Sequence, residues 1–212
     1  MEEILERVKK GIQYRDMMLD IDDEAEKRVT GYATTFNEPY TLYEDVDVVF
    51  REQVDPGAFN GADLSDVIMQ YDHRGRVFAR IRNNTLALRT DSKGLFVSAD
   101  LGGTEIGRQL YEEIRGGYTD KMSFAFTVSA DSVERYEENN RRIYLRTITQ
   151  ISKVYDVSAV SIPANDGTSI SARSFVDGIL AEEQKEALQK FETEQRRKRL
   201  QLRLRIMGGL NS

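Results

Sequence analysis

The stretch Met122-Ser123-Phe124-Ala125-Phe126-Thr127-Val128 decides the fold class that this sequence predicts. Large apolar residues alternate along it with small or polar ones, which is the pattern of a β-strand with one face in a core. The polar turn Glu137–Arg142 lies between two further strand-like segments and predicts a hairpin. Val154–Ile162 predicts a last strand, so this part of the chain is mainly strand.

One segment upstream of this stretch has the spacing of a helix. Apolar residues recur every four positions from Ile106 to Ile114, which predicts a helix over Thr104–Arg115. Thr104 followed by an acidic residue suits the start of that helix, and Gly116-Gly117 suits its end.

Short strand-like segments separated by turn residues fill most of the remaining chain. They are Tyr14–Ile21, Arg28–Phe36, Val46–Val54, Val67–Tyr71, Val77–Arg82, Thr85–Thr90 and Leu95–Leu101. With a short helix expected at residues 2–9, this order of elements predicts an α+β fold that is mainly β. The strands suit a small barrel or sandwich with a helix packed on it.

The pattern changes after Gly178, where apolar residues at helical spacing lie among many charges. We therefore expect residues 1–177 to form the main domain and residues 178–212 to form a charged helical extension. Six basic residues crowd its end, namely Arg196, Arg197, Lys198, Arg199, Arg203 and Arg205. The whole chain has a formal net charge of −6, so nucleic-acid binding is not expected of the main body.

Few residue types are available for chemistry. The absence of cysteine excludes disulfides, thiolate zinc sites and cysteine nucleophiles. With one histidine in the chain no metal site is expected, and Asp20–Glu24 lacks the spacing of a calcium loop. No phosphate-binding glycine loop is present, so no cofactor is expected. There is no run of about 18 apolar residues, so no membrane-spanning helix is expected, and the charged N-terminus does not resemble a secretory signal.

Three residues are candidates for catalysis: His73, Ser123 and Asp156. An imidazole is the natural general base near neutral pH, and His73 enters a glycine-containing turn after an apolar segment. Ser123 suits a nucleophile at the edge of a packed strand, although the α/β-hydrolase elbow is absent. Asp156, inside an apolar strand, suits a group that orients an imidazolium. Each also has a structural interpretation: a hydrogen-bonded histidine, a polar strand position, and an acid that faces water or arginine.

Six segments, in this order, carry a resemblance to a known family. They are Gly31-Tyr32-Ala33 with Phe36, Val54-Asp55-Pro56-Gly57-Ala58-Phe59, Asp72-His73, Lys93-Gly94-Leu95, Met122-Ser123-Phe124-Ala125-Phe126, and Asp156-Val157-Ser158-Ala159-Val160 with Pro163-Ala164-Asn165. The chain resembles the prohead proteases of tailed bacteriophages, whose fold resembles herpesvirus assemblin. The matching segments span residues 31–165.

The resemblance implies an assemblin-like β-barrel and a serine endopeptidase. Such an enzyme cleaves scaffold or major capsid protein extensions inside the immature shell in the host cytoplasm, and can cleave itself. Carried over by position, His73 is the base, Ser123 is the nucleophile and Asp156 is the third member of the triad. The family usually has Glu at the position of Asp156 and tends to have Gly at that of Ala125. The second histidine of assemblin has no counterpart, because His73 is the only histidine.

The resemblance also implies partners. These are the phage capsid and scaffold proteins, with a homodimer left open, and neither nucleic acid nor a membrane is required. We expect the segment after Gly178 to direct the enzyme to an assembly partner; the alternative is a helix that completes the fold. Two other functions stay open: an inactive capsid-assembly or scaffold protein on the same fold, and an unrelated acidic binding module. A distance of roughly 3–4 Å between Ser123 Oγ and a His73 ring nitrogen would favour the enzyme.

Overall fold

The computed structural model describes residues 12–23, 27–161 and 170–209. The helix predicted at residues 2–9 lies outside these ranges. The chain divides into two compact units, Met1–Arg173 and Ser174–Ser212. Among the described residues, no helix is long and apolar enough to span a bilayer.

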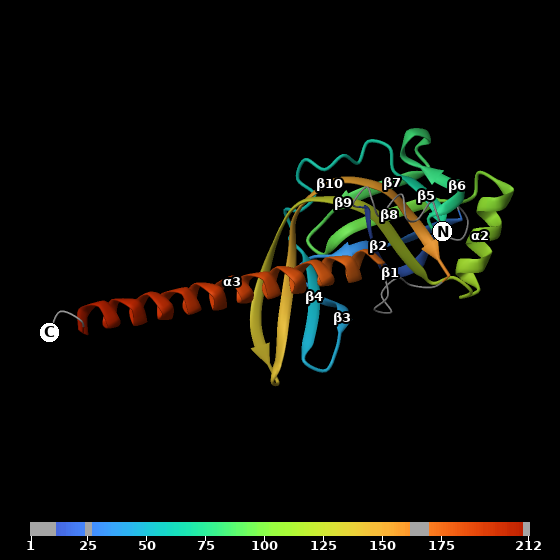
Figure 1. The fold of residues 1–212 in the computed structure, drawn as a ribbon. Helices are drawn as coiled ribbons and strands as arrows, with labels where there is room; N and C mark the ends of the chain where they lie inside the picture. The colour runs from blue at the N-terminus through green and yellow to red at the C-terminus, as the bar shows by residue number, and fades with distance from the viewer. Residues whose placement is uncertain (1–11, 24–26, 162–169, 210–212) are drawn as a thin grey trace. The chain divides into compact units, whose positions relative to one another are not determined.

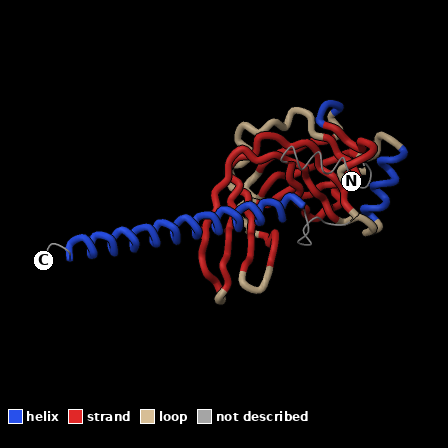
Figure 2. Tube along the Cα trace, viewed as in Figure 1, coloured by secondary structure: helices blue, strands red, loops and turns tan. Residues whose placement is uncertain are grey.

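Strands make up most of the larger unit (Figures 1 and 2). In chain order they are β1 (Ile12–Asp23), β2 (Arg28–Thr35), β3 (Tyr40–Glu44), β4 (Val48–Val54), β5 (Ile68–Tyr71), β6 (Arg74–Arg80), β7 (Leu86–Thr90), β8 (Gly94–Asp100), β9 (Lys121–Glu138) and β10 (Arg141–Val160). In the described residues before α3 (Ile170–Gly209), its helical elements are the 3-10 turn η1 (Ile81–Asn83) and helix α2 (Glu105–Arg115). The predicted α+β, mainly β class is therefore confirmed.

Helix α2 forms where the sequence predicts it, because its cap and its apolar face agree. The Thr104 hydroxyl accepts a hydrogen bond from the backbone N–H of Gly107 at 3.0 Å, which satisfies one donor of the first turn. Leu110 and Ile114 are buried in the main hydrophobic core. Gly117 follows the helix with a φ of +71°, a conformation that glycine adopts without strain.

The strands form one sheet in the order β3-β4-β10-β9-β1-β2-β8-β7, with β5 beside β10 and β6 beside β5. Within the described residues β3 and β7 are free ends, so the sheet is not closed into the predicted barrel. The reason lies in β9 and β10, which are 18 and 20 residues long. Their outer halves pair with each other and, through β10, with β4, and they project from the body as an arm (Figure 1). This pairing carries the β3 end of the sheet away from β7.

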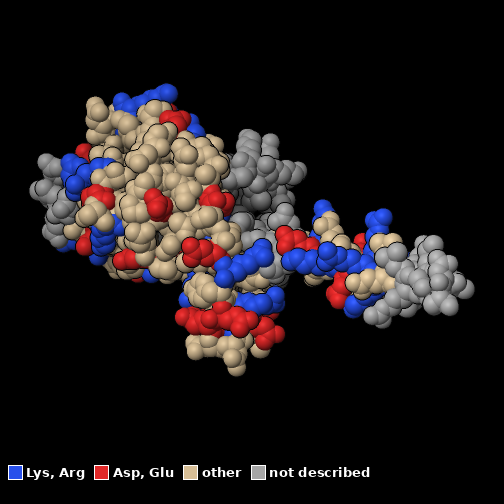
Figure 3. Space-filling view, turned by 90° about the vertical axis from the view of Figure 1, so that its left-hand side faces the viewer, with Lys and Arg blue, Asp and Glu red and all other residues tan. Residues whose placement is uncertain are grey.

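The arm contains the hairpin predicted at residues 137–142. Its two turn residues, Asn139 and Asn140, both have positive φ, as the tight turns that favour hairpins require. Phe50 and Tyr144 stack at 4.5 Å between ring centroids and stabilise the pairing of β4 with β10. Exposed acidic residues line the arm, namely Glu44, Asp45, Asp47, Glu134, Glu137 and Glu138. Figure 3 shows Asp and Glu side chains gathered over the projecting strands.

A buried polar cluster lies where the arm meets the body. Glu52, which is 0% exposed, accepts from Arg15 Nε at 2.5 Å and from Arg146 Nη1 at 2.8 Å. The Tyr40 hydroxyl also donates to Glu52. Burial alone would raise the pKa of Glu52, but the two arginines and these hydrogen bonds hold it below its ordinary value. A buried carboxylate with this many partners stays charged and joins β1, β3, β4 and β10.

Helix α3 (Ile170–Gly209) forms most of the smaller unit. The helix predicted after Gly178 is thus present and begins earlier. At 40 residues α3 is about 60 Å long. Among its described side chains, Leu188 and Phe191 are each 59% exposed.

Candidate active site

The alternation of β9 places Ser123 on the face opposite the main core. Met122 and Phe124 point into that core, together with Val157 of β10. Side chains alternate between the two faces of a strand, so Ser123 lies on the other face. Antiparallel pairing sets it directly opposite Ser158. Since residues two apart share a face, Asp156 also lies on this side of the sheet.

Ser123 is buried although it is polar. Its side chain is 0% exposed, and its Oγ atom makes no hydrogen bond within the described part of the chain. The hydrogen bond to His73 that a resting triad would contain is therefore not formed. A buried hydroxyl without a partner is costly, and such groups are common where a ligand or substrate completes the bonding.

His73 lies in the two-residue turn between β5 and β6. Tyr71 pairs with Arg74 across this hairpin, so Asp72 and His73 are its central residues. Their φ angles are +48° and +56°. Both angles are those of the tight turns that favour hairpins, and Asp and His are among the non-glycine residues that adopt positive φ most often.

The imidazole of His73 is held by a buried carboxylate. Its Nδ1 atom lies 2.5 Å from Asp156 Oδ1, and Asp156 is only 3% exposed. A carboxylate can only accept, so Nδ1 is the donor and the lone pair of the neutral ring falls on Nε2. Nε2 is itself buried. This arrangement gives His73 the tautomer and the orientation that a general base needs.

Ser158 extends the contact between His73 and Asp156. Its hydroxyl donates to the same Oδ1 atom of Asp156 at 2.8 Å, and it is fully buried. Directly opposite residues on antiparallel strands have Cβ atoms about 5 Å apart, which makes Ser158 the cross-strand neighbour of Ser123. Ser158 was not among the residues that the sequence singled out; its position two residues after Asp156 on a strand was the available signal.

Asp72, also missed, fastens the turn that carries His73 to the end of β10. The backbone N–H of Asp72 donates to the carbonyl of Ala159 at 2.9 Å. Its carboxylate accepts from the Ser161 N–H at 2.9 Å and from the Ser161 hydroxyl at 3.0 and 3.1 Å. Asp72 thus fixes the turn to the strand that holds Asp156.

The family's glycine at the position of Ala125 is not needed for backbone conformation here. Ala125 pairs with Asp156 in the β9–β10 ladder and is not among the residues with positive φ. A methyl group is therefore compatible with the extended backbone beside the site.

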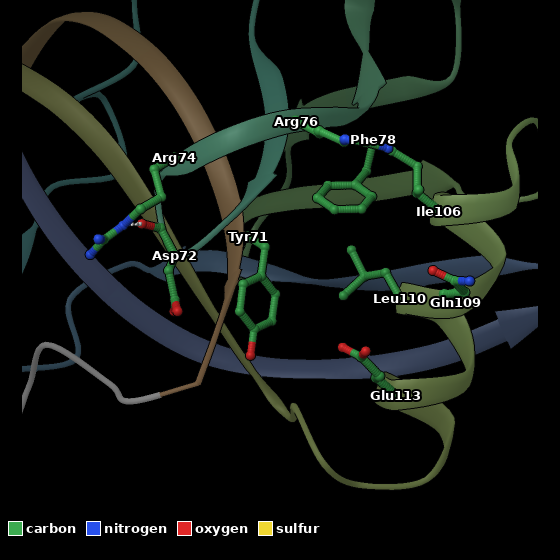
Figure 4. Close-up of a pocket in the computed structure, with 9 residues that line it drawn as sticks. All are labelled: Tyr71, Asp72, Arg74, Arg76, Phe78, Ile106, Gln109, Leu110 and Glu113. Atoms are coloured by element: carbon green, nitrogen blue, oxygen red, sulfur yellow. Dashed lines mark hydrogen bonds between the residues drawn. The ribbon is translucent and has the colours of Figure 1, made fainter.

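A groove begins at Asp72 and runs between β6 and α2 (Figure 4). It has a volume of about 620 Å³ and is lined by Tyr71, Asp72, Arg74, Arg76, Phe78, Ile106, Gln109, Leu110 and Glu113. Figure 4 shows the rings of Tyr71 and Phe78 beside Leu110, with Glu113 on the α2 side. The groove is large enough for several residues of a polypeptide.

Comparisons with known proteins identify the family. The family model of the caudovirus prohead serine proteases matches residues 15–179. The prohead protease of Enterobacteria phage HK97 is 28% identical over 153 residues, which cover 70% of this chain and 61% of that protein. The chain thus spans less than two thirds of that relative's length. No solved structure matches. The chain belongs to the caudovirus prohead serine protease family.

Proposed function

We propose that this protein is an active serine endopeptidase of prohead maturation, with Ser123 as nucleophile, His73 as general base and Asp156 as the group that orients His73. The observation that carries the proposal is the 2.5 Å contact between His73 Nδ1 and Asp156 Oδ1. This contact lies on the same sheet face as Ser123. It supports the catalytic interpretation over the structural one, because a buried carboxylate on the imidazole sets the tautomer and orientation that a general base uses.

In the proposed reaction each of the three residues has its own role. Ser123 Oγ attacks the scissile carbonyl while its proton moves to His73 Nε2, and Asp156 stabilises the imidazolium that forms. His73 then gives the proton to the leaving amine, and the C–N bond breaks to leave an acyl group on Ser123. Water attacks this ester in the second half-reaction, losing a proton to His73, which returns it to Ser123 Oγ. The products are two peptides, and the enzyme is regenerated.

In this proposal, substrate binding completes the catalytic site. Ser123 Oγ has no hydrogen-bond partner in the described residues, so the nucleophile and base are brought together when a polypeptide occupies the site. Catalytic hydrogen bonds that are long in a free enzyme commonly tighten in the substrate complex.

The substrates belong to the same proposal. We infer that they are extensions of the phage major capsid protein or scaffold protein, cleaved inside the assembling shell in the host cytoplasm, and that the enzyme can also cleave itself. Family membership supports this inference. The name of the HK97 relative, "Prohead protease", agrees with it.

An inactive assembly protein on the same fold is the second candidate. The absence of a hydrogen bond on Ser123 Oγ in the described residues favours it, because an inherited serine need not remain aligned with a base. This candidate predicts binding to capsid or scaffold protein without any cleavage.

The deciding experiment combines covalent labelling with cleavage. Purified protein is treated with a fluorophosphonate probe and mapped by mass spectrometry, and is separately incubated with the cognate phage capsid protein. We expect one adduct, on Ser123, and cleavage that Ser123→Ala and His73→Ala abolish. Ser132→Ala, on the exposed outer half of β9, is the matched control and retains both. Cleavage by Ser123→Ala protein would overturn the assignment, and binding of capsid protein without cleavage would establish the inactive alternative.

A further inference from the structure

Strand β10 carries a β-bulge directly before Asp156. The register of its pairing with β9 shifts between Val154 and Asp156, so Tyr155 is the extra residue of that ladder. Val154 and Val157 both lie in the core although they are three positions apart, which a regular strand with a period of two does not allow. The extra residue therefore turns Asp156 and Ser158 together to the face that carries the candidate nucleophile.

The Ser158 hydroxyl gives its single proton to Asp156. Its Oγ atom donates to Asp156 Oδ1 at 2.8 Å, and both residues are buried, at 0% and 3% exposure. The same Oδ1 atom accepts from His73 Nδ1 at 2.5 Å. Two donors thus meet on one buried carboxylate oxygen, where hydrogen bonds to a charge are strong and their loss is costly.

These two hydrogen bonds fix the orientation of the Asp156 carboxylate. The last torsion of an aspartate side chain has a broad energy minimum, so contact with an imidazole alone would leave the carboxylate plane loosely defined. Ser158 belongs to the same strand and lies two residues further on, so its donor has a fixed position relative to the Asp156 backbone. The serine therefore determines which carboxylate oxygen faces His73 and at what angle.

We infer that Ser158 is a positioning residue whose hydroxyl holds Asp156 in line with His73. Its effect on catalysis rests on the proposed function, whereas its effect on the imidazole does not. The imidazolium forms only as the reaction proceeds, so a carboxylate held in place stabilises the transition state more than the bound substrate. Ser158 is fully buried and acts through Asp156, so substrate affinity should be nearly independent of it.

Steady-state kinetics of Ser158→Ala test the inference, with a peptide that spans the cleavage site of the cognate phage capsid protein as substrate. We expect kcat to fall roughly 5- to 30-fold while KM stays within about twofold of wild type. Proton NMR gives a readout that does not need cleavage, because the Nδ1 proton of the single histidine should give a far-downfield resonance that shifts or broadens in Ser158→Ala. Ser158→Cys fills the same space but donates weakly, so its kcat should lie between those of the wild type and Ser158→Ala. Its similar size also keeps the test available if the alanine protein is unstable.

Ser152→Ala is the matched control. It removes another hydroxyl of β10, one whose Oγ atom lies 2.7 Å from Thr127 Oγ1, so kcat and the His73 resonance should stay as in wild type. The inference would be overturned by wild-type kcat or an unchanged resonance in Ser158→Ala, by full activity in Ser158→Cys, or by an equal loss in Ser152→Ala. A resonance that responds to Ser158→Ala in a protein without cleavage activity counts against the proposed function alone. Cleavage that Ser158→Ala leaves unaffected counts against the role of Ser158 alone.

Discussion

The turn that carries His73 offers a quantitative test of how the fold supports the proposed base. Substitution Asp72→Ala removes the carboxylate that accepts from the Ser161 N–H and hydroxyl at 2.9–3.1 Å. Ser161 is exposed, so each lost hydrogen bond costs about 0.5–1.5 kcal/mol. Alanine also tolerates the φ of +48° poorly, which adds about 1 kcal/mol. The turn should therefore be weakened by roughly 2–4 kcal/mol in total.

Weakening this turn loosens the contact between His73 and Asp156. If the turn is weakened by 2 kcal/mol or more, we expect kcat/KM for a peptide substrate to fall about 30-fold or further. Comparing Asp72→Ala with Asp72→Asn and Asp72→Gly separates the lost hydrogen bonds from the unfavourable backbone conformation. Asp72→Asn keeps an acceptor and tolerates positive φ, so it should stay within about fivefold of wild type. Asp72→Gly removes the hydrogen bonds without the strain and should lie between Asn and Ala.

The single histidine makes the assay specific. In wild-type protein the proton on His73 Nδ1, held 2.5 Å from Asp156 Oδ1, should give one far-downfield resonance in the proton NMR spectrum. Asp72→Ala should broaden or shift that resonance while circular dichroism shows an intact fold. Wild-type activity together with an unchanged His73 resonance in Asp72→Ala would refute the reasoning, because the turn would then be held without its carboxylate.

Three further expectations follow from the site, the polar cluster and the C-terminal helix. Asp156→Asn should keep the shape of the site but lose the anionic partner of His73, so activity should fall by orders of magnitude, though less than for Ser123→Ala; a near-wild-type rate would place the orienting acid elsewhere. The pKa of Glu52 is lowered in the folded state, so its stabilising contribution is present above the ordinary Glu pKa of about 4.3 and is lost as pH falls below it. Thermal unfolding followed from pH 7 to 3 should show this loss in wild type and a shallower one in Glu52→Gln, which should also unfold at lower temperature at pH 7; parallel curves would contradict the assignment. A protein ending near Gly178 should stay folded and cleave peptides yet fail to enter assembling shells, and an insoluble product would show instead that α3 completes the fold.

Local signals in the sequence were sufficient for much of the architecture. The period of two in residues 122–128 predicted the strand that bears Ser123, and a period near four with a Thr104 cap predicted α2. Both succeed because hydrogen bonding and burial within one element depend on neighbours along the chain. β3 was missed, since five residues at a sheet edge show little alternation, and the outer halves of β9 and β10 were interpreted as separate short strands.

The candidate site also divides into residues that the sequence indicated and residues that only the tertiary structure revealed. The sequence singled out His73, Ser123 and Asp156 by residue type, by the uniqueness of the histidine and by family resemblance. It did not indicate Ser158 or Asp72, because serine and aspartate are common on strands and in turns. Their roles depend on contacts with Asp156 and with Ser161, and the second of these joins residues 89 positions apart in the chain.

The sequence by itself thus determined the class of fold, the places of its main strands and of α2, and the family. Only the tertiary structure decided that the sheet stays open, with β9 and β10 projecting as an arm, and that a tight turn sets His73 against Asp156. It also decided that Ser123 is buried without a hydrogen bond to any described residue. The physical reason is that hydrophobic alternation and helix capping depend on residues that are neighbours along the chain. Sheet closure and the meeting of side chains depend on the twist, length and register of strands that pair across the whole chain.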